Sequence, residues 1–305
     1  MTSSTCRILA AYLAAGAPLC AAHAQDKAPV SQDAAPGAQP VDPTVPREQG
    51  EANPAAGWTV NVEPALWWVS PSGRARLPAS GATRSDRIKL SALNLDNPRF
   101  TPAGAVSINA DKWRFSFNGA SYNEDRQATA DSSFQFGDVA ASAGDRLHTS
   151  FDYSTFEVTG GYRVLAYDFK ARSENPENAA DLVLNVYAIA GVRLTDVKFG
   201  IERGSSSSST DQFFVEPIVG ARSELQIRRD FDMNLQLSGG GYGDSDRSAV
   251  SFDIAVSFGW RPVENVGVEI GWRQILYTMK DGSGTGEFSY DGAMAGLFAS
   301  ILIRF

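Results

Sequence analysis

The feature that most constrains the fold of this chain is a strict alternation of apolar with small or polar residues. In the stretch "VSFDIAVSFGW", every second residue from Val250 to Trp260 is large and apolar, whereas the residues between them, such as Ser251 and Asp253, are not. A period of two is the side-chain period of a β-strand whose two faces meet different surroundings. The pattern predicts a strand with one apolar and one polar face.

The same alternation recurs between residues 58 and 305, broken by Gly, Asp, Ser and Asn. It predicts an all-β antiparallel fold with strands over residues 58–69, 101–109, 113–122, 151–165, 182–197, 213–227, 231–240, 250–260, 266–277 and 294–305. Ten strands are predicted, and eight or twelve remain open because the segment 86–97 reads as an extra strand or a plug. Short connections such as "ADK" at 110–112 alternate with long ones such as "RGSSSSSTD" at 203–211, as in outer-membrane barrels.

The N-terminal residues 1–24 have the pattern of a secretory signal peptide. Arg7 precedes an apolar stretch from Ile8 to Cys20, and the small-x-small triplet that ends at Ala24 predicts cleavage before Gln25. A lipoprotein that is modified on Cys20 is the less favoured alternative, because the residue before a lipidated Cys is normally small. An uncleaved anchor is also disfavoured, since the apolar stretch is shorter than a membrane-spanning helix.

Composition divides the remaining chain into a tether and one folded unit. Residues 25–56 hold six prolines and no aromatic residue, which predicts a disordered periplasmic tether, and residues 57–305 are predicted to fold. Both cysteines lie in the predicted signal peptide, so we expect no disulfide, no cysteine-based metal site and no cofactor. The chain has 27 Lys and Arg against 35 Asp and Glu, which argues against nucleic acid as a partner.

Aromatic residues favour a barrel in lipid over a soluble sandwich. Trp58 and Trp68 share a face ten residues apart, which is ~33 Å along a strand and ~25 Å in height at a tilt of ~40°. That height matches the apolar band between two aromatic girdles, to which we also assign Trp113 and Trp260. The opposite faces carry Gly, Ser, Asn and full charges, which the core of a sandwich would not tolerate. The pattern therefore predicts a transmembrane β-barrel.

The last strand carries a resemblance to a known class. Its alternation of Leu297, Ala299, Ile301, Ile303 and Phe305 resembles the closing strand of small, porin-like outer-membrane β-barrel proteins of bacteria. The resemblance spans residues 57–305 and implies export to the outer membrane of a Gram-negative bacterium and contact with its lipid. It also implies that the barrel-assembly machinery recognises Phe305 as an assembly signal. It says nothing about activity.

The faces opposite the apolar ones are predicted to line the lumen. The lining charges are expected to be Glu63, Arg114, Glu157, Arg193, Glu216, Arg222, Asp253, Glu269 and Arg273, and Arg228 and Arg304 are assigned to the same face. A lumen of ten strands is narrow, so we expect these groups to form Arg–carboxylate networks. The predicted function is a structural barrel with a salt-bridged lumen or a narrow passive pore.

Three alternatives belong to other functional classes. His148 and Ser150 have i, i+2 spacing and resemble the His-x-Ser element of outer-membrane phospholipases, although the Asn of that family has no counterpart shortly downstream. Adhesion through the long loops is a second alternative. A hydrophobic-ligand channel is disfavoured because charges are interleaved with inward aromatics such as Trp67 and Phe298. We expect no enzyme activity.

Overall fold

Long antiparallel strands make up most of the part of the chain that the structure describes. The computed structural model describes residues 57–169, 182–228 and 230–305, which lie in the compact unit Pro54–Phe305. The predicted signal peptide and tether, 1–24 and 25–56, lie outside the described residues. The long strands are β1 (Trp58–Arg76), β3 (Arg99–Ala110), β4 (Trp113–Thr129), β7 (Arg146–Asp168), β8 (Leu182–Arg203), β9 (Ser206–Ile227), β10 (Phe231–Gly243), β11 (Arg247–Val263), β12 (Val266–Asp281) and β13 (Phe288–Arg304).

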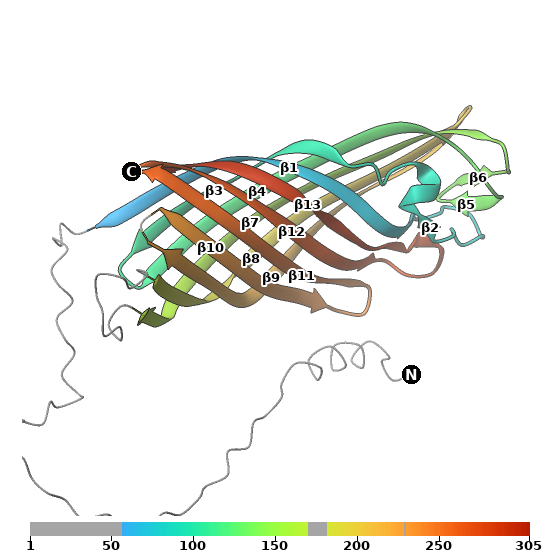
Figure 1. Cartoon of the computed structure of the whole chain (residues 1–305). Coiled ribbons are helices and arrows are strands. Elements are labelled where there is room, and N and C mark those ends of the chain that lie inside the picture. The colour runs from blue at the N-terminus through green and yellow to red at the C-terminus, as the bar shows by residue number, and fades with distance from the viewer. Residues whose placement is uncertain (1–56, 170–181, 229) are drawn as a thin grey trace, which may run out of the picture. The chain divides into compact units, whose positions relative to one another are not determined.

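The long strands form a ring. They pair in the order β13-β12-β11-β10-β9-β8-β7-β4-β3-β1, and β13 pairs again with β1, from Asn61 opposite Arg304 to Arg76 opposite Ser289. Each strand is antiparallel to its neighbours, as sequential strands joined by turns must be. The predicted all-β antiparallel fold is confirmed, and Figure 1 shows the strands crossing the body at a common tilt.

The two ends of the ring differ. The chain enters β1 and leaves β13 at the end where β3 and β4 are joined by only Asp111 and Lys112, which we call the short-turn end. The opposite loop end carries β2 (Ile88–Lys89), the 3-10 helix η1 (Leu90–Leu93), the hairpin of β5 (Phe134–Phe136) and β6 (Val139–Ala141), and the 3-10 turn η3 (Gly284–Gly286).

Several strands are longer at the loop end than the sequence predicts. The segment 203–211, predicted as a flexible loop, is instead the end of β8 and the beginning of β9, joined by only Gly204 and Ser205. The alternation that marks a membrane strand stops there because the outward residues become Asp211, Ser209 and Ser207, while the pairing continues. Arg228 also differs from its assignment, since it is exposed in a turn with a left-handed φ of 57° and does not line the lumen.

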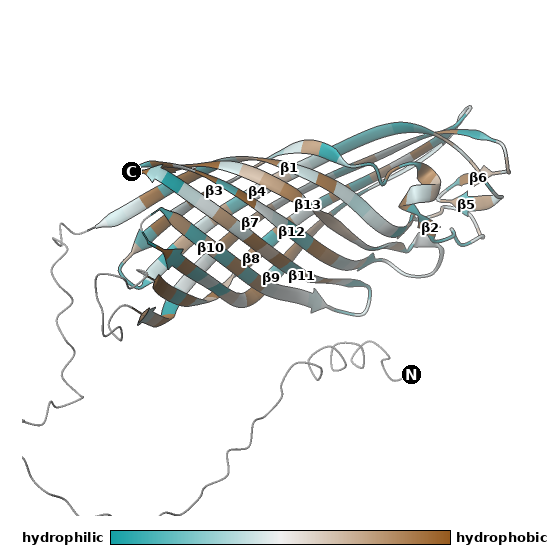
Figure 2. Ribbon diagram, viewed as in Figure 1, coloured by the Kyte–Doolittle hydropathy of each residue, from teal (hydrophilic) through white to brown (hydrophobic). Residues whose placement is uncertain are grey.

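The outward faces carry the large exposed apolar side chains. On β1 these are Trp58, Leu66 and Trp68, and on β11 they include Phe252, Phe258 and Trp260. Figure 2 shows brown, hydrophobic residues alternating with polar ones along the strands of this outer wall. The residues between them point inward, so the two faces of each strand have opposite polarity. That arrangement is inverted relative to a soluble core, in which apolar faces are the buried ones.

The segment 86–97 is a plug rather than an additional full strand. It contains only the two-residue β2, which pairs beside β1, followed by η1. Leu90, Leu93 and Leu95 are fully buried, so this segment folds its apolar side chains into the loop end of the ring. Of the two expectations for this segment, the plug therefore fits the structure.

Candidate functional site

The lumen near the short-turn end is polar and contains open space. One cavity of about 140 Å³ is lined by residues that include Glu63, Arg114, Arg222 and Glu224. A second, of about 120 Å³, shares Glu63, Arg222, Asn234 and Glu269 with the first and extends to Trp67 and Phe298. Either volume holds a few water molecules. This half of the lumen is therefore a small hydrated chamber.

The charged side chains of the chamber form ion pairs within the lumen. Arg114 of β4 reaches Glu224 of β9 at 3.0 Å, although two strands separate them in the ring. Arg222 contacts the same carboxylate at 2.7 Å through Nε. Asn109 and Ser107 accept further hydrogen bonds from the Arg114 guanidinium, at 3.1 Å each. Strands that are not neighbours in the ring are therefore tied together, and each of the two guanidinium groups has a charged or polar acceptor, as burial requires.

On the loop-end side of the chamber, a network of two arginines and two acids crosses the lumen. The Arg193 guanidinium donates to Glu157 Oε2 and Asp253 Oδ2, both at 2.8 Å. Arg273 contacts the same two carboxylates, at 2.6 Å for Asp253 and 3.5 Å for Glu157. Arg193 is fully buried, and the two acids are 1% exposed. The network joins β7 and β8 to β11 and β12, and it is charge-balanced.

Glu216 lies beside this network without belonging to it. Its cross-strand partner on β8 is Arg193, yet neither carboxylate oxygen has a hydrogen-bond partner among the described residues, and the side chain is fully buried. The next inward residues of β9 on either side are Phe214 and Ile218, both 2% exposed or less. Glu216 is therefore a buried acid between two apolar side chains of its own strand, at the level of the network.

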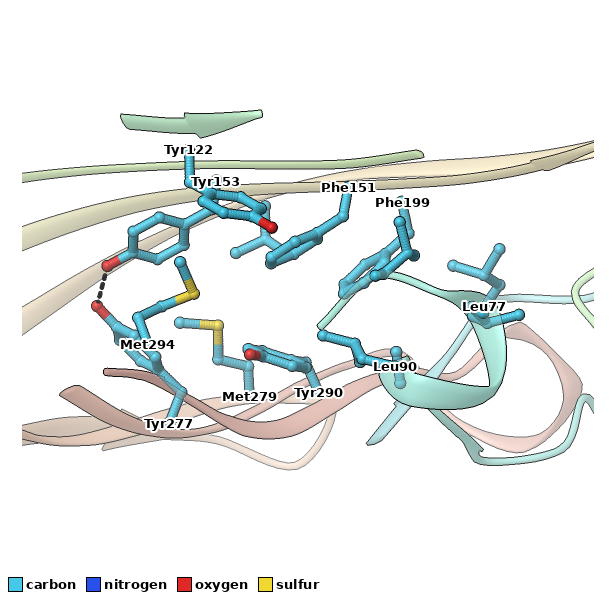
Figure 3. Close-up of a cluster of buried hydrophobic side chains, with 14 of the residues drawn as sticks. Leu77, Leu90, Tyr122, Phe151, Tyr153, Phe199, Tyr277, Met279, Tyr290 and Met294 are labelled. Carbon is cyan, nitrogen blue, oxygen red and sulfur yellow. Dashed lines mark hydrogen bonds between the residues drawn. The ribbon is translucent and has the colours of Figure 1, made fainter. Parts of the chain in front are cut away.

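Beyond the network, toward the loop end, the lumen is dry. The Tyr153 and Tyr277 hydroxyls share a hydrogen bond of 2.7 Å across the ring. Figure 3 shows this pair next to Met279, Met294 and the rings of the next layer. The rings of Phe151 and Phe199 stack with centroids 4.6 Å apart, and the Tyr290 centroid lies 6.0 Å from that of Phe151.

This apolar layer fills the cross-section. Its members, which we call the seal, are 3% exposed or less, and they are Phe151, Tyr153, Val197, Phe199, Phe214, Ile275, Tyr277, Met279, Phe288, Tyr290 and Met294. A water-filled path would leave the residues around it exposed. These side chains come from β7, β8 and β9 on one side of the ring and from β12 and β13 on the other. Because they have almost no exposed surface, no water-sized passage runs between them.

The connections of the loop end cover the seal. Leu90 of η1 packs toward the rings from the end of the ring (Figure 3). The Thr149 hydroxyl donates to the Leu93 carbonyl at 2.8 Å, which fixes η1 to β7. The backbone N–H of Asp86 donates to the Gln135 carbonyl at 2.7 Å, so the two longest connections also hold each other.

An ionic latch fixes the same connection to Glu287, the residue before β13. The Glu287 carboxylate accepts from Arg76 at 2.6 Å and from Arg84 at 2.8 Å. Burial raises the pKa of Glu287, but the Arg84 and Arg76 guanidinium groups outweigh burial, and the net pKa lies below its ordinary value of 4.5. The latch is therefore fully charged at neutral pH.

The structure brings the predicted lumen residues together in two groups. Glu63, Arg114, Arg222 and Glu269 lie in the chamber, whereas Glu157, Arg193, Asp253 and Arg273 form the network and Glu216 adjoins it. Sequence reasoning missed the seal. The sequence did contain a signal for these inward rings. Phe151 and Tyr153 lie an even number of residues from Glu157 on β7, and Phe199 lies an even number from Arg193 on β8, so each is on the lumen face of its strand.

The residues assigned to the girdles and the assembly signal lie on the outside. Trp58, Trp68, Trp113 and Trp260 are 44–65% exposed. Trp113 packs against Tyr162 with ring centroids 5.0 Å apart, and Trp68 stacks on Phe100 at 6.1 Å. Phe305 is also exposed, and its backbone exchanges hydrogen bonds with Val60 of β1.

His148 and Ser150 do not form a dyad in the structure. Both lie on β7 with their side chains on the outer wall, and His148 Nε2 is 3.2 Å from Asp125 Oδ1 on β4. No hydrogen bond joins His148 to Ser150 among the described residues. The cross-strand neighbours of His148 are Gln127 and Glu202. Asp125, which is directly opposite Ser150, therefore holds the His148 imidazole in place of the Ser150 hydroxyl.

Within residues 57–169, 182–228 and 230–305, no cluster of His, Cys, Asp and Glu has the arrangement of a metal site. None of the helices in that part of the chain is long and apolar enough to cross a membrane.

An antiparallel ring that is apolar outside and polar or sealed inside has the architecture of a transmembrane β-barrel. No protein-family model and no curated protein matches this chain. The solved structures that it resembles are outer-membrane β-barrels. The outer membrane protease OmpT of Escherichia coli is 12% identical, with 81% of this chain and 97% of that chain covered and a TM-score of 0.49.

Two further structures resemble the chain more remotely. Neisserial surface protein A is 12% identical over 81% of this chain and 97% of its own, with a TM-score of 0.32. The toluene transporter TodX of Pseudomonas putida is 7% identical over 80% and 89%, with a TM-score of 0.24. Likenesses as remote as these do not tell what the chain does.

Proposed function

We propose that this chain is a ten-stranded barrel of the outer membrane whose sealed lumen makes it a structural, non-conducting protein. The ring of long strands and the outward apolar band support the membrane placement. Contact with outer-membrane lipid and recognition of the last strand by the assembly machinery belong to the same proposal. Of the two functions predicted from the sequence, the structural one is favoured over the narrow passive pore.

The observation that carries this proposal is the seal. A passive pore needs a continuous hydrated path, and the hydrated chamber stops at the Arg193 network. Beyond the network, the rings of Phe151, Phe199 and Tyr290 leave no exposed surface between them. Opening a path would break a fully desolvated ion network and separate packed rings, and both changes are costly in free energy.

Single-channel current in a planar bilayer tests the proposal directly. We expect no steady current from the refolded wild type or from Arg222→Ala, since Arg222 lies in the chamber and not in the seal. A steady wild-type current that Arg222→Ala enlarges would overturn the proposal in favour of the passive pore.

Cysteine labelling provides an independent test, because the chain has cysteine only at positions 6 and 20. A small, charged thiol reagent should label Asn234→Cys, which lines both cavities, and should not label Met279→Cys in the seal. Equal labelling of the two variants in folded protein would mean that water passes the seal.

A second candidate is surface interaction through the loop end, which one observation favours. The connections there are fixed by specific contacts, such as the Ser80 backbone N–H to Asp138 at 2.7 Å and Arg203 Nε to Asp145 at 2.8 Å. Ordered loops on a rigid frame are the usual carriers of recognition. Binding of loop-directed ligands by the intact protein, lost on replacing 80–86 with a Gly-Ser segment, would support this function.

Enzyme activity is not part of the proposal. A lipid-hydrolysis assay with wild type and His148→Ala tests this point, and we expect the same background rate from both. A wild-type rate that His148→Ala abolishes would restore the hydrolase alternative.

A further inference from the structure

Two cations face each other on the outer wall at the loop end. Trp68, Ser70, Ser72 and Arg74 are alternate residues of β1 on its outward face. Arg74 is directly opposite Lys89 of β2 on one side and Asp291 of β13 on the other, and Asp291 forms its ion pair with Arg87. The Arg74 and Lys89 side chains are exposed, and neither has an ion-pair partner among the described residues. Like charges directly opposite each other destabilise a strand pair unless something neutralises them.

The two cations border a concavity. It has a volume of about 250 Å³ and is lined by Ser72, Gly73, Arg74, Lys89, Ser91 and Asp96, which we call the Arg74 concavity. The Ser70 hydroxyl donates to the Asp96 carbonyl at 2.6 Å and so holds the far wall to β1. A guanidinium, an ammonium and two hydroxyls are therefore presented together, with the Asp96 carboxylate as the one acidic group.

The neighbourhood of the Arg74 concavity has more cations than anions. Arg76, Arg84 and Lys280 share the single carboxylate of Glu287, and Arg87 pairs with Asp291. Burial lowers the pKa of Arg87, and repulsion from Arg76 and Arg74 lowers it further. The excess of positive charge creates a positive potential that attracts anions.

Gly73 shapes the floor of the concavity. Its φ of +116° is a conformation that L side chains rarely adopt, and a Cβ would lie 2.1 Å from the Asp291 carbonyl oxygen. The backbone of β1 therefore bends tightly against β13 at this point, and Ser72 and Arg74 on either side keep their outward direction.

We propose that the Arg74 concavity is a binding site for a phosphate ester, of the kind carried by the saccharide headgroup of a glycolipid. Guanidinium, ammonium and hydroxyl groups are the side chains that bind phosphate oxygens. The distance of the concavity from the apolar band also fits a headgroup. Ser72 lies four residues beyond Trp68, which is ~13 Å along the strand and ~10 Å outside the aromatic girdle at a tilt of ~40°.

The lipid source of the phosphate rests on the proposed membrane location, whereas the phosphate chemistry does not. Acyl chains would contact the stacked rings of Trp68 and Phe100 at the edge of the apolar band. The phosphorylated sugar would then lie over Ser72 and Arg74. Inorganic phosphate offers the same chemistry without the acyl chains, so the two sources are separable by experiment.

The test measures binding to the full folded chain in detergent micelles. The probes are diphosphorylated lipid A, its dephosphorylated form and inorganic phosphate, each followed by the quenching of tryptophan fluorescence and by calorimetry. The variants are Arg74→Ala with Lys89→Ala, Asp96→Asn, and the control Lys112→Ala, whose exposed lysine lies at the short-turn end. The electrophoretic shift on heating verifies that each variant is folded.

We expect phosphate-dependent binding that the Arg74→Ala, Lys89→Ala variant weakens at least about tenfold, because two cationic donors are removed and a single charge-assisted hydrogen bond already accounts for about that factor. Asp96→Asn should instead tighten binding, because it removes the carboxylate that lines the concavity, and Lys112→Ala should leave binding unchanged. Tighter binding of the diphosphorylated lipid than of inorganic phosphate identifies a headgroup site, and equal binding identifies a site for free phosphate.

Two results would overturn the proposal. Equal affinity for the phosphorylated and dephosphorylated lipids would show that acyl chains alone bind. Weaker binding by folded Asp96→Asn would show that the concavity prefers a cation or a neutral sugar. Neither result bears on whether the lumen is sealed, so this proposal and the proposed function fail separately.

Discussion

The Arg193 network makes the sharpest prediction about stability. In Arg193→Met, the carboxylates of Glu157 and Asp253 would share one guanidinium, Arg273, at a site where both acids are 1% exposed. One negative charge is then buried without compensation. Removing one partner of a buried ion pair costs ~3–5 kcal/mol. We expect a loss of this size in the free energy of unfolding, measured by urea titration in detergent micelles with tryptophan fluorescence.

Two controls separate charge imbalance from lost packing. Lys198→Met removes an exposed pair with Asp211 at 2.7 Å, and should cost far less than Arg193→Met because water screens the pair. The double variant Arg193→Met, Asp253→Asn restores neutrality and keeps Arg273 with Glu157, so it should be more stable than Arg193→Met alone by ~1–2 kcal/mol. If Arg193→Met is no less stable than Lys198→Met, or if the double variant is the less stable of the two, the argument from buried charge is wrong.

Three further predictions concern other layers. Ile270→Arg places a charge on an outward residue that is 64% exposed, which should cost ~2–4 kcal/mol in lipid; a loss below ~1 kcal/mol would contradict its contact with lipid. Tyr153→Phe should lower the free energy of unfolding by ~1 kcal/mol. The double variant Tyr153→Phe, Tyr277→Phe should lose less than the sum of the two single variants, because it leaves no hydroxyl unpaired. Full additivity in urea titrations would argue against the hydrogen bond between the two hydroxyls. Because the pKa of Glu287 is below 4.5, the latch stabilises the fold above that pH and is lost as the pH falls through the lowered pKa. In the wild type, the rate of amide exchange in residues 77–89, corrected for its intrinsic pH dependence, should therefore rise as the pH falls through that pKa. In Glu287→Gln the corrected rate should be high at every pH.

The period-two pattern was sufficient to predict most of the frame. It depends only on which face of a strand meets lipid, and it placed Glu157, Arg193 and Asp253 inward from sequence alone. The same pattern could not give strand length at the loop end. There β9 continues to Ser206 with outward Asp211 and Ser209, because water on the outside removes the requirement for apolar residues.

The layering inside the lumen could not be predicted from any single strand. The period-two pattern assigns both Phe151 and Glu157 to the interior, but it does not say which residues of the other strands lie at the same level along the barrel axis. Height depends on the stagger between strands, which the registers fix only once the ring is formed. Met279 and Phe199 thus come to pack in one seal although 80 residues separate them.

The reach of the connections gives a physical reason for the order of the layers. At the short-turn end, connections such as Asp111–Lys112 are too short to fold into the lumen, so the wall must satisfy its own polar groups with partners and water. At the loop end, the connection between β1 and β3 is long enough to bring Leu90 and Leu93 over the opening, and water is excluded there. The Arg193 network lies where these two environments meet. Arg193 is fully buried at that level, so its guanidinium has no contact with water, which is why it is held by two carboxylates and two serine hydroxyls at once.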